Sequence, residues 1–154
     1  MSTNSIWKQT NSLVLFWEYE SQEQINAFVK AIDQFLLLKK FKHVLIVVSV
    51  PKDIDKKSLP PHFLIYYNSP ADYSMFGKLK DVQLNSELHK TYDLLIYNGN
   101  LDSKFFPLLK QASIKRRLLL NADHPKFDLQ IACAQIEIAA QLNYIHDTLE
   151  KIEQ

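Results

Sequence analysis

The chain is poor in glycine, with only Gly77 and Gly99 among its 154 residues. At the average frequency of about 7%, a chain of this length would contain roughly eleven. Glycine lets the backbone approach a phosphate group closely, and the phosphate-binding motifs G-x-G-x-x-G and G-x-x-x-x-G-K-[ST] need several at close spacing. Two isolated glycines exclude both motifs, and with them the common nucleotide-binding loops.

Cysteine is rarer still, since Cys133 is the only one. A single thiol cannot form a disulfide within the chain, and it excludes a cysteine-rich zinc site. The five histidines are not spaced to share one face of a helix, and the motif H-E-x-x-H is absent. We therefore expect no metal and no cofactor.

Long hydrophobic runs are also missing. The apolar runs are far shorter than the roughly 20 residues that a membrane-spanning helix needs. The N-terminal sequence MSTNSIWKQTNS lacks the basic and then apolar regions of a signal peptide. Together with the lone cysteine, this predicts a cytoplasmic protein with no membrane partner. We expect residues 1–11 to form a polar N-terminal tail.

The remaining composition is that of a folded domain, with 47% apolar and 23% charged residues. Apolar runs predict six strands, at residues 13–19, 43–50, 63–67, 92–97, 117–120 and 127–131. Helical periodicity and a capping box at residues 21–24 predict helices at residues 21–40, 84–89, 101–112 and 134–152. Pro107 lies inside the third of these, which favours a start nearer Phe105.

The order of these elements predicts the fold class. Strands alternate with helices, and the apolar strands do not alternate with polar residues, so both faces of the sheet are expected to be covered. We expect a single three-layer, Rossmann-like α/β domain over residues 1–154, with a mainly parallel sheet of five to six strands and helices on both faces.

One turn is a candidate ligand site, because it follows a probable central strand at the end where α/β folds bind ligands. Its polar residues and its glycine are Asn98, Gly99, Asn100, Asp102 and Ser103. A small ligand or a phosphate is one interpretation. A tight strand-to-helix turn with a helix cap is the other, and it is favoured because there is one glycine and no adjacent lysine or threonine.

Charge is distributed unevenly along the chain. Residues 39–126 hold fifteen basic and eight acidic residues, whereas the rest holds three basic and nine acidic residues. Such asymmetry indicates an anionic partner. The candidate RNA-binding residues are the cations Lys104, Lys110, Lys115, Arg116, Arg117 and Lys126. Loop aromatics could stack on unpaired bases, namely Tyr66, Tyr67, Tyr73 and Phe76.

Several segments resemble a family of short uncharacterised cytoplasmic α/β proteins that are common in the Bacteroidota. The segments are Tyr92-Asp93-Leu94-Leu95-Ile96, Phe106-Pro107-Leu108, Phe127-Asp128-Leu129-Gln130-Ile131 and Asp72-Tyr73-Ser74-Met75-Phe76-Gly77. That family is faintly similar to the N-terminal half of heptosyltransferase-like glycosyltransferases. This chain departs from the family at Tyr97 and Asn98, where an acid is frequent. The resemblance implies a Rossmann-like fold and, from extra large-subunit proteins in ribosomes of that group, ribosome association.

Three functions follow as expectations. The first is a non-catalytic protein that docks on ribosomal RNA or another RNA–protein assembly through the six cations. The second is a nucleotide- or sugar-binding enzyme related to half of a glycosyltransferase, using the turn at residues 98–103. The third is a protein–protein adaptor, which requires the apolar stripe Ile138, Leu142 and Ile145 to be exposed; we expect that stripe to lie in the core.

Overall fold

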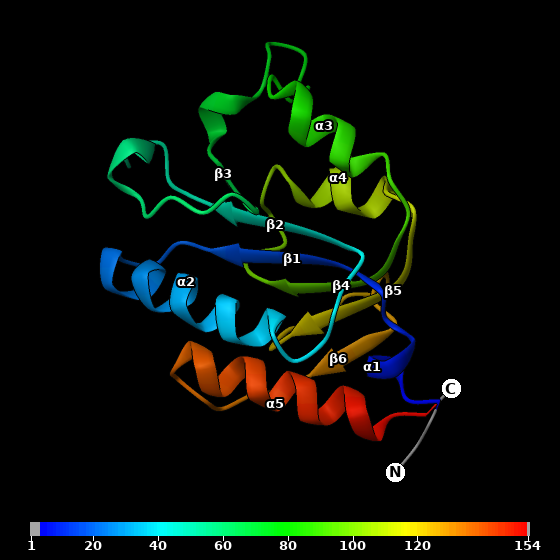
Figure 1. Cartoon of the computed structure of the whole chain (residues 1–154). Helices are drawn as coiled ribbons and strands as arrows, with labels where there is room; N and C mark the ends of the chain where they lie inside the picture. The colour runs from blue at the N-terminus through cyan, green and yellow to red at the C-terminus, as the bar shows by residue number, and fades with distance from the viewer. Residues whose placement is uncertain (1–3, 154) are drawn as a thin grey trace.

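The computed structural model describes residues 4–153 and contains one six-stranded sheet in which every neighbouring pair of strands is parallel. The strand order is β3-β2-β1-β4-β5-β6 (Figure 1). The chain runs outward from β1 to β2 and β3, then returns to the other side of β1 and runs outward again through β4, β5 and β6, so the strand order reverses between β1 and β4. The strands are β1 (Ser12–Glu18), β2 (His43–Ser49), β3 (Ile65–Asn68), β4 (Tyr92–Asn98), β5 (Ile114–Leu120) and β6 (Leu129–Ile131).

Helices cover both faces of the sheet, which confirms the predicted three-layer, Rossmann-like α/β fold (Figure 1). One face carries α2 and α5, with α1 at the end of α5, and the other carries α3 and α4. The helices are α1 (Ile6–Gln9), α2 (Gln22–Leu36), α3 (Val82–Leu88), α4 (Phe106–Gln111) and α5 (Ile138–Lys151), and two short 3₁₀ turns are η1 (Lys56–Ser58) and η2 (Pro70–Asp72). No helix within residues 4–153 is both long and apolar enough to traverse a bilayer.

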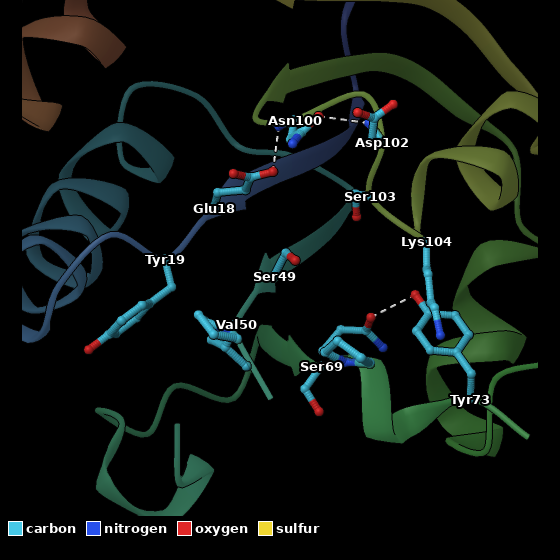
Figure 2. Close-up of a pocket in the computed structure, with 13 residues that line it drawn as sticks. Glu18, Tyr19, Ser49, Val50, Ser69, Tyr73, Asn100, Asp102, Ser103 and Lys104 are labelled. Carbon is cyan, nitrogen blue, oxygen red and sulfur yellow. Dashed lines mark hydrogen bonds between the residues drawn. The ribbon is translucent and has the colours of Figure 1, made fainter. Parts of the chain in front are cut away.

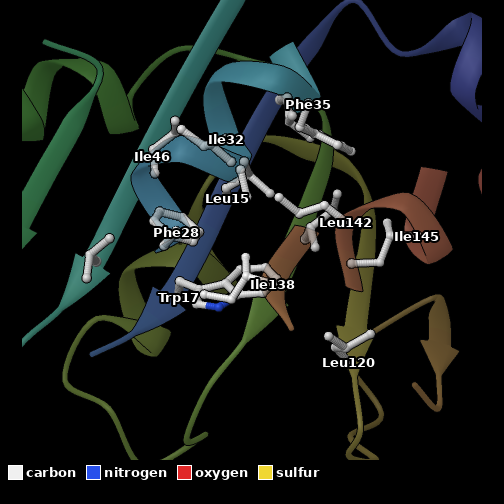
Figure 3. Packing of buried hydrophobic residues seen from close by; sticks show 14 of the residues in the cluster. Leu15, Trp17, Phe28, Ile32, Phe35, Ile46, Leu120, Ile138, Leu142 and Ile145 are labelled. Carbon is white, nitrogen blue, oxygen red and sulfur yellow. The ribbon is translucent and has the colours of Figure 1, made fainter. Parts of the chain in front are cut away.

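The alternation of side chains along β1 divides the core into two layers. Leu13, Leu15 and Trp17 pack against α2 and α5 (Figure 3), whereas Val14 and Phe16 pack towards α3 and α4. All five side chains are buried, so residues 13–17 of β1 are apolar without polar alternation. The stripe Ile138, Leu142 and Ile145 is buried in the first layer, as expected, and an adaptor surface built on that stripe is therefore wrong.

The segment expected as an N-terminal tail is folded where the structure describes it. Residues 6–9 form α1, and the buried Trp7 ring contacts the rings of Phe35, Phe41 and His146 at centroid distances of 5.4, 5.6 and 4.7 Å. The amide of Ile6 donates to the carbonyl of Ile152. Residues 1–3 of the expected tail lie outside the described residues. Burial of Trp7 across three separate segments explains why a polar sequence folds here.

The middle of the chain differs from expectation in detail. The helix α4 begins at Phe106, with Pro107 in its first turn, as the proline indicated. The third strand begins at Ile65, and Phe63, expected within it, is 92% exposed. The last helix begins at Ile138, so Cys133 lies in the extended segment before it and is buried.

Candidate functional site

A shallow pocket lies at the carboxyl end of the sheet, among the segments that follow four of its strands (Figure 2). Its volume is about 310 Å³. The lining comes from the ends of β1, β2, β3 and β4, and consists of Glu18, Tyr19, Ser49, Val50, Pro51, Asn68, Ser69, Pro70, Tyr73, Asn100, Asp102, Ser103 and Lys104. Since β1 and β4 are the strands between which the strand order reverses, this is the position at which open α/β sheets usually bind ligands.

The turn after β4 forms one wall of this pocket, although not every predicted residue takes part. Asn100, Asp102 and Ser103 line it, whereas Asn98 ends β4 and Gly99 lies behind the wall. A Cβ atom on Gly99 would lie 2.8 Å from Cγ of Glu18 and 2.9 Å from Cε1 of Phe16. Glycine is therefore required here by the close approach of β4 to β1, and not by a ligand.

Hydrogen bonds within the turn hold its shape. The amide of Asn100 donates to the Glu18 carboxylate, which joins the ends of β4 and β1. The amide of Asp102 donates to Oδ1 of Asn100 at 2.8 Å, and the amide of Phe105 donates to Oγ of Ser103 at 3.2 Å. The turn is therefore held by its own side chains, although no side chain caps the start of α4, and it presents polar groups to the pocket.

The opposite wall contains a polar group that no sequence motif indicated. Asn68 ends β3 and is only 4% exposed. Its Oδ1 accepts a 2.8 Å hydrogen bond from the Tyr73 hydroxyl, but its amide nitrogen has no partner among the described residues. Burial raises the pKa of the Tyr73 hydroxyl, so that group remains a donor at neutral pH. Asn68 therefore keeps a free N–H donor in the pocket lining.

The charges around the pocket do not suit a phosphate group. Glu18 and Asp102 line it, with Lys104 as the single cation. The amide at the third position of α2 is already taken by Ser21, whose Oγ accepts from Gln24 at 3.0 Å. The Gln24 side chain in turn accepts from the amide of Glu20. The predicted N-cap at Ser21 is confirmed, but the capping box is incomplete, because the Gln24 side chain reaches the amide before Ser21 and not that of Ser21 itself. The first strand-to-helix turn is thus closed by its own side chains at the position where nucleotide-binding sheets hold phosphate.

The cations predicted to bind RNA are spread over different parts of the molecule. Lys104 lines the carboxyl-end pocket, with its Nζ 5.7 Å from the centre of the Tyr73 ring. Arg116 and Arg117 are adjacent on β5 and hence point to opposite faces of the sheet. The six residues thus do not form one surface.

Arg117 has a structural role. Its guanidinium donates to the carbonyls of Leu109, Lys110, Ala112 and Ile114 at 2.9–3.2 Å. These are the carbonyls that the end of α4 and the following turn leave without a helical partner. The positive charge at the carboxyl end of a helix also opposes the negative end of its dipole. Arg117 therefore caps the end of α4, and its guanidinium is engaged within the fold.

Lys110 and Lys126 lie beside a pair of stacked rings on the α4 face. The Phe106 and Phe127 rings stack at 5.8 Å, and Nζ of Lys110 is 5.4 Å from the Phe106 centroid. Lys126 precedes Phe127 directly and is exposed. These two predicted cations are therefore both accessible, and each belongs to a segment that contributes one ring of the stacked pair.

The amino end of the sheet brings further cations together. Lys42 precedes β2 and donates its amide to Asn11 before β1, while Lys115 lies at the start of β5. In register, Tyr92 of β4 pairs with Ile114 of β5. Strands β2 and β5 are three spacings apart, or about 15 Å. We name the exposed Lys40, Lys42 and Lys115 the amino-end surface. Its first two members were missed because they lie over 60 positions from Lys115. Arg116, which follows Lys115 on β5, points to the opposite face of the sheet and is not included.

The acidic groups at this end are already engaged. Asp93 accepts hydrogen bonds from the amides of Asn11 and Ser12 at 2.8 and 3.2 Å. Glu87 pairs with Lys90 at 2.6 Å, and Glu150 lies 3.4 Å from Nε2 of His146. By contrast, none of Lys40, Lys42 and Lys115 has an ion-pair partner within residues 4–153. Asp93 keeps its charge, because accepting from an amide does not neutralise a carboxylate, and it lines the same recess as Lys42. The amino-end surface therefore consists of three lysines that form no ion pair, with Asp93 as a nearby opposing charge.

The remaining titratable side chains do not assemble a recognisable catalytic set. Nε2 of His62 lies 2.7 Å from Asp33, and its Nδ1 accepts from the amide of Leu64. Both ring nitrogens are thus occupied, and this pair ties the loop before β3 to α2. Within the described part of the chain, no group of three or more histidine, cysteine, aspartate or glutamate side chains is placed to hold a metal ion.

Comparison with known protein families, with curated proteins and with solved structures found no match for this chain. Its function is therefore inferred from the geometry and the charges at the two ends of the sheet.

Proposed function

We propose that the protein is a non-catalytic binding protein that docks on ribosomal RNA, or on another RNA–protein assembly, through the amino-end surface. The observation that carries the proposal is the placement of Lys40 and Lys42, from one segment, at the same end of the sheet as Lys115, from another. Cations that are far apart in the sequence and lie on one end of a sheet, without carboxylate partners, form an electrostatic footprint for a polyanion.

The surface suits a phosphate backbone better than unpaired bases. The aromatics considered for base stacking lie away from it: Tyr73 is buried beside the pocket, and Tyr67 donates its hydroxyl to the carbonyl of Pro60. Phe76, which is exposed, lies in the loop at the opposite end of the sheet. Contacts made by lysines to phosphates position a protein without reading the base sequence. We therefore expect docking on structured RNA with little sequence preference.

Lys110 and Lys126 extend the surface along the α4 face. Lys110 belongs to the last turn of α4, whose end leads directly to Lys115. An RNA backbone that crosses the amino end of β5 can continue towards these two lysines. They retain the binding role that the sequence predicted for them, whereas Arg117 caps a helix and Lys104 lies at the other end of the sheet.

The test compares two triple variants. Lys40→Ala/Lys42→Ala/Lys115→Ala removes the free lysines of the amino-end surface. Lys52→Ala/Lys57→Ala/Lys78→Ala removes three exposed lysines from the carboxyl-end loops and changes the net charge equally. We expect the first variant to bind ribosomes about 30-fold more weakly at low salt, and its salt slope to fall by about 2 to 3. The second should resemble the unmodified protein.

Co-sedimentation with ribosomes in sucrose gradients at low and then high salt provides the measurement, with titration of purified ribosomal RNA as its quantitative form. Equal binding by both triple variants and the unmodified protein would refute the proposal. Equal weakening by both would show that net charge alone matters, and would refute the assignment to this surface.

A further inference from the structure

We propose that the carboxyl-end pocket binds a small, uncharged, hydroxyl-rich molecule of monosaccharide size. This binding is separate from RNA docking, because it uses the opposite end of the sheet and none of the residues of the amino-end surface. The observation that carries it is the free amide nitrogen of Asn68, a side chain that is 96% buried and lines the pocket.

The amide nitrogen of Asn68 is not itself sealed from solvent, because among the described residues only Nε of Arg117 is a fully buried side-chain polar atom without a partner. It therefore opens into the pocket, where a ligand acceptor can replace water. Tyr73 fixes the orientation of the Asn68 amide by donating to Oδ1, which leaves the N–H groups for another acceptor. That acceptor can come from solvent or from a ligand. The pocket volume of about 310 Å³ lies at the lower end of the range of small-molecule sites.

The charges in the lining select against ionic ligands of either sign. An anion would meet the carboxylates of Glu18 and Asp102, and a cationic amine would meet the ammonium of Lys104. A neutral molecule avoids both repulsions. Hydroxyl groups can donate to the carboxylates and accept from Lys104 and from Asn68, so one chemical class satisfies donors and acceptors of both kinds.

The geometry of the lining fits such a ligand (Figure 2). Asp102, Ser103 and Lys104 follow one another along one wall, and Ser49 faces the pocket from the end of β2. Val50 and Tyr19 add apolar surface, against which the C–H face of a sugar ring can pack. Polar groups that converge on a concave site with some apolar surface are typical of ligand pockets.

The experiment is a titration of the ¹⁵N-labelled protein followed by two-dimensional NMR. The probes are D-glucose, D-galactose and D-mannose, with inorganic phosphate and putrescine as anionic and cationic counterparts. We expect at least one sugar to shift the side-chain amide signals of Asn68 and the backbone amides of Asn100 and Lys104. Absence of these shifts with every sugar up to roughly 100 mM, a hundredfold above a Kd of about 1 mM, would overturn the proposal. Preferential binding of phosphate or putrescine would also overturn it.

Two variants locate the binding. Asn68→Asp keeps an acceptor for the Tyr73 hydroxyl but removes the free donor, and Asp102→Ala removes an exposed carboxylate that has no structural partner among the described residues. Each should weaken sugar binding about tenfold. Asn143→Asp, exposed on α5, is the matched control and should change nothing. Unchanged affinity in Asp102→Ala would contradict the proposal even if Asn68→Asp were poorly folded.

Discussion

The two ends of the sheet differ in shape and in charge. At the carboxyl end, long connections surround a pocket, since 15 residues separate β2 from β3 and 13 separate β3 from α3. At the amino end the connections are short, with two residues between α4 and β5. The carboxyl end mixes carboxylates with lysines, whereas the amino end presents lysines whose acidic neighbours are engaged. The pocket proposed to bind a ligand and the lysine surface proposed to dock on RNA thus lie at opposite ends of the strands.

The strongest test of the carboxyl end concerns its glycine. Gly99→Ala should lower the free energy of unfolding by about 3 kcal/mol, because the new Cβ would lie within 3.0 Å of Glu18 and of the buried Phe16 ring. Gly77→Ala is the control: its φ of 78° is strained for alanine, but no atom lies within 4 Å of the new Cβ. We expect about 1 kcal/mol there. Urea denaturation measures both, and equal losses would contradict the close-approach argument.

At the amino end, the sharpest contrast is between neighbouring arginines. Arg117→Met should lower the free energy of unfolding by about 2 kcal/mol, because the carbonyls at the end of α4 lose a charged donor. Arg116→Met should cost about 0.5 kcal/mol or less, since the Arg116 side chain makes no hydrogen bond or ion pair within residues 4–153. Thermal or urea unfolding distinguishes them. A stable Arg117→Met that no longer binds RNA would restore Arg117 to the binding surface.

Substitution of single lysines should give a smaller difference in RNA affinity between the two ends of the sheet. Lys115→Ala is expected to weaken RNA binding a few-fold and to lower the salt slope by about 0.8, the contribution of roughly one phosphate contact. Lys57→Ala, also exposed but in the β2–β3 connection, should leave both quantities unchanged. Filter binding over a series of salt concentrations provides the comparison. A larger effect from Lys57 would move the docking surface to the carboxyl end.

The smallest expected effect is a dependence of stability on pH at the carboxyl end. Burial tends to raise the pKa of Asp72, but hydrogen bonds from Lys56 and from the amide of Ser69 outweigh it and lower that pKa below its ordinary value. The folded pKa is depressed, so this stabilisation is present above about pH 4 and is lost as the pH falls through the folded pKa.

Asp72→Asn should therefore reduce the change in urea midpoint between neutral and acidic pH. Asp123→Asn, an exposed aspartate with no partner among the described residues, is the control. An unchanged pH profile in Asp72→Asn would show that the ion pair with Lys56 does not contribute.

Much of the fold was predictable because its signals are local. The apolar strands, the N-cap at Ser21 and the effect of Pro107 each depend on neighbouring residues, and each is present. The helix α1 was not predictable, because only Ile6 and Trp7 are apolar and their partners come from α2, the segment after it and α5. The strand β3 was placed too early because Phe63 is apolar but exposed.

The candidate site was predicted less well, for the same reason. Counting cations along the chain combined Lys104 with Lys115, which lie at opposite ends of the sheet, and omitted Lys42. Only the strand order shows which loops share an end. The free amide of Asn68 likewise depends on Tyr73 being in place, and no pattern of residue types indicates it.

The bond between the Glu18 carboxylate and the amide of Asn100 bears on how this scaffold could change. It joins the carboxyl ends of β1 and β4, the position at which Rossmann-like sheets bind a dinucleotide. A variant of this chain that binds a dinucleotide here would therefore need more than additional glycines in the turns. The Glu18–Asn100 hydrogen bond would also have to be broken, whereas the direct pairing of β1 with β4 would keep the two halves of the sheet aligned.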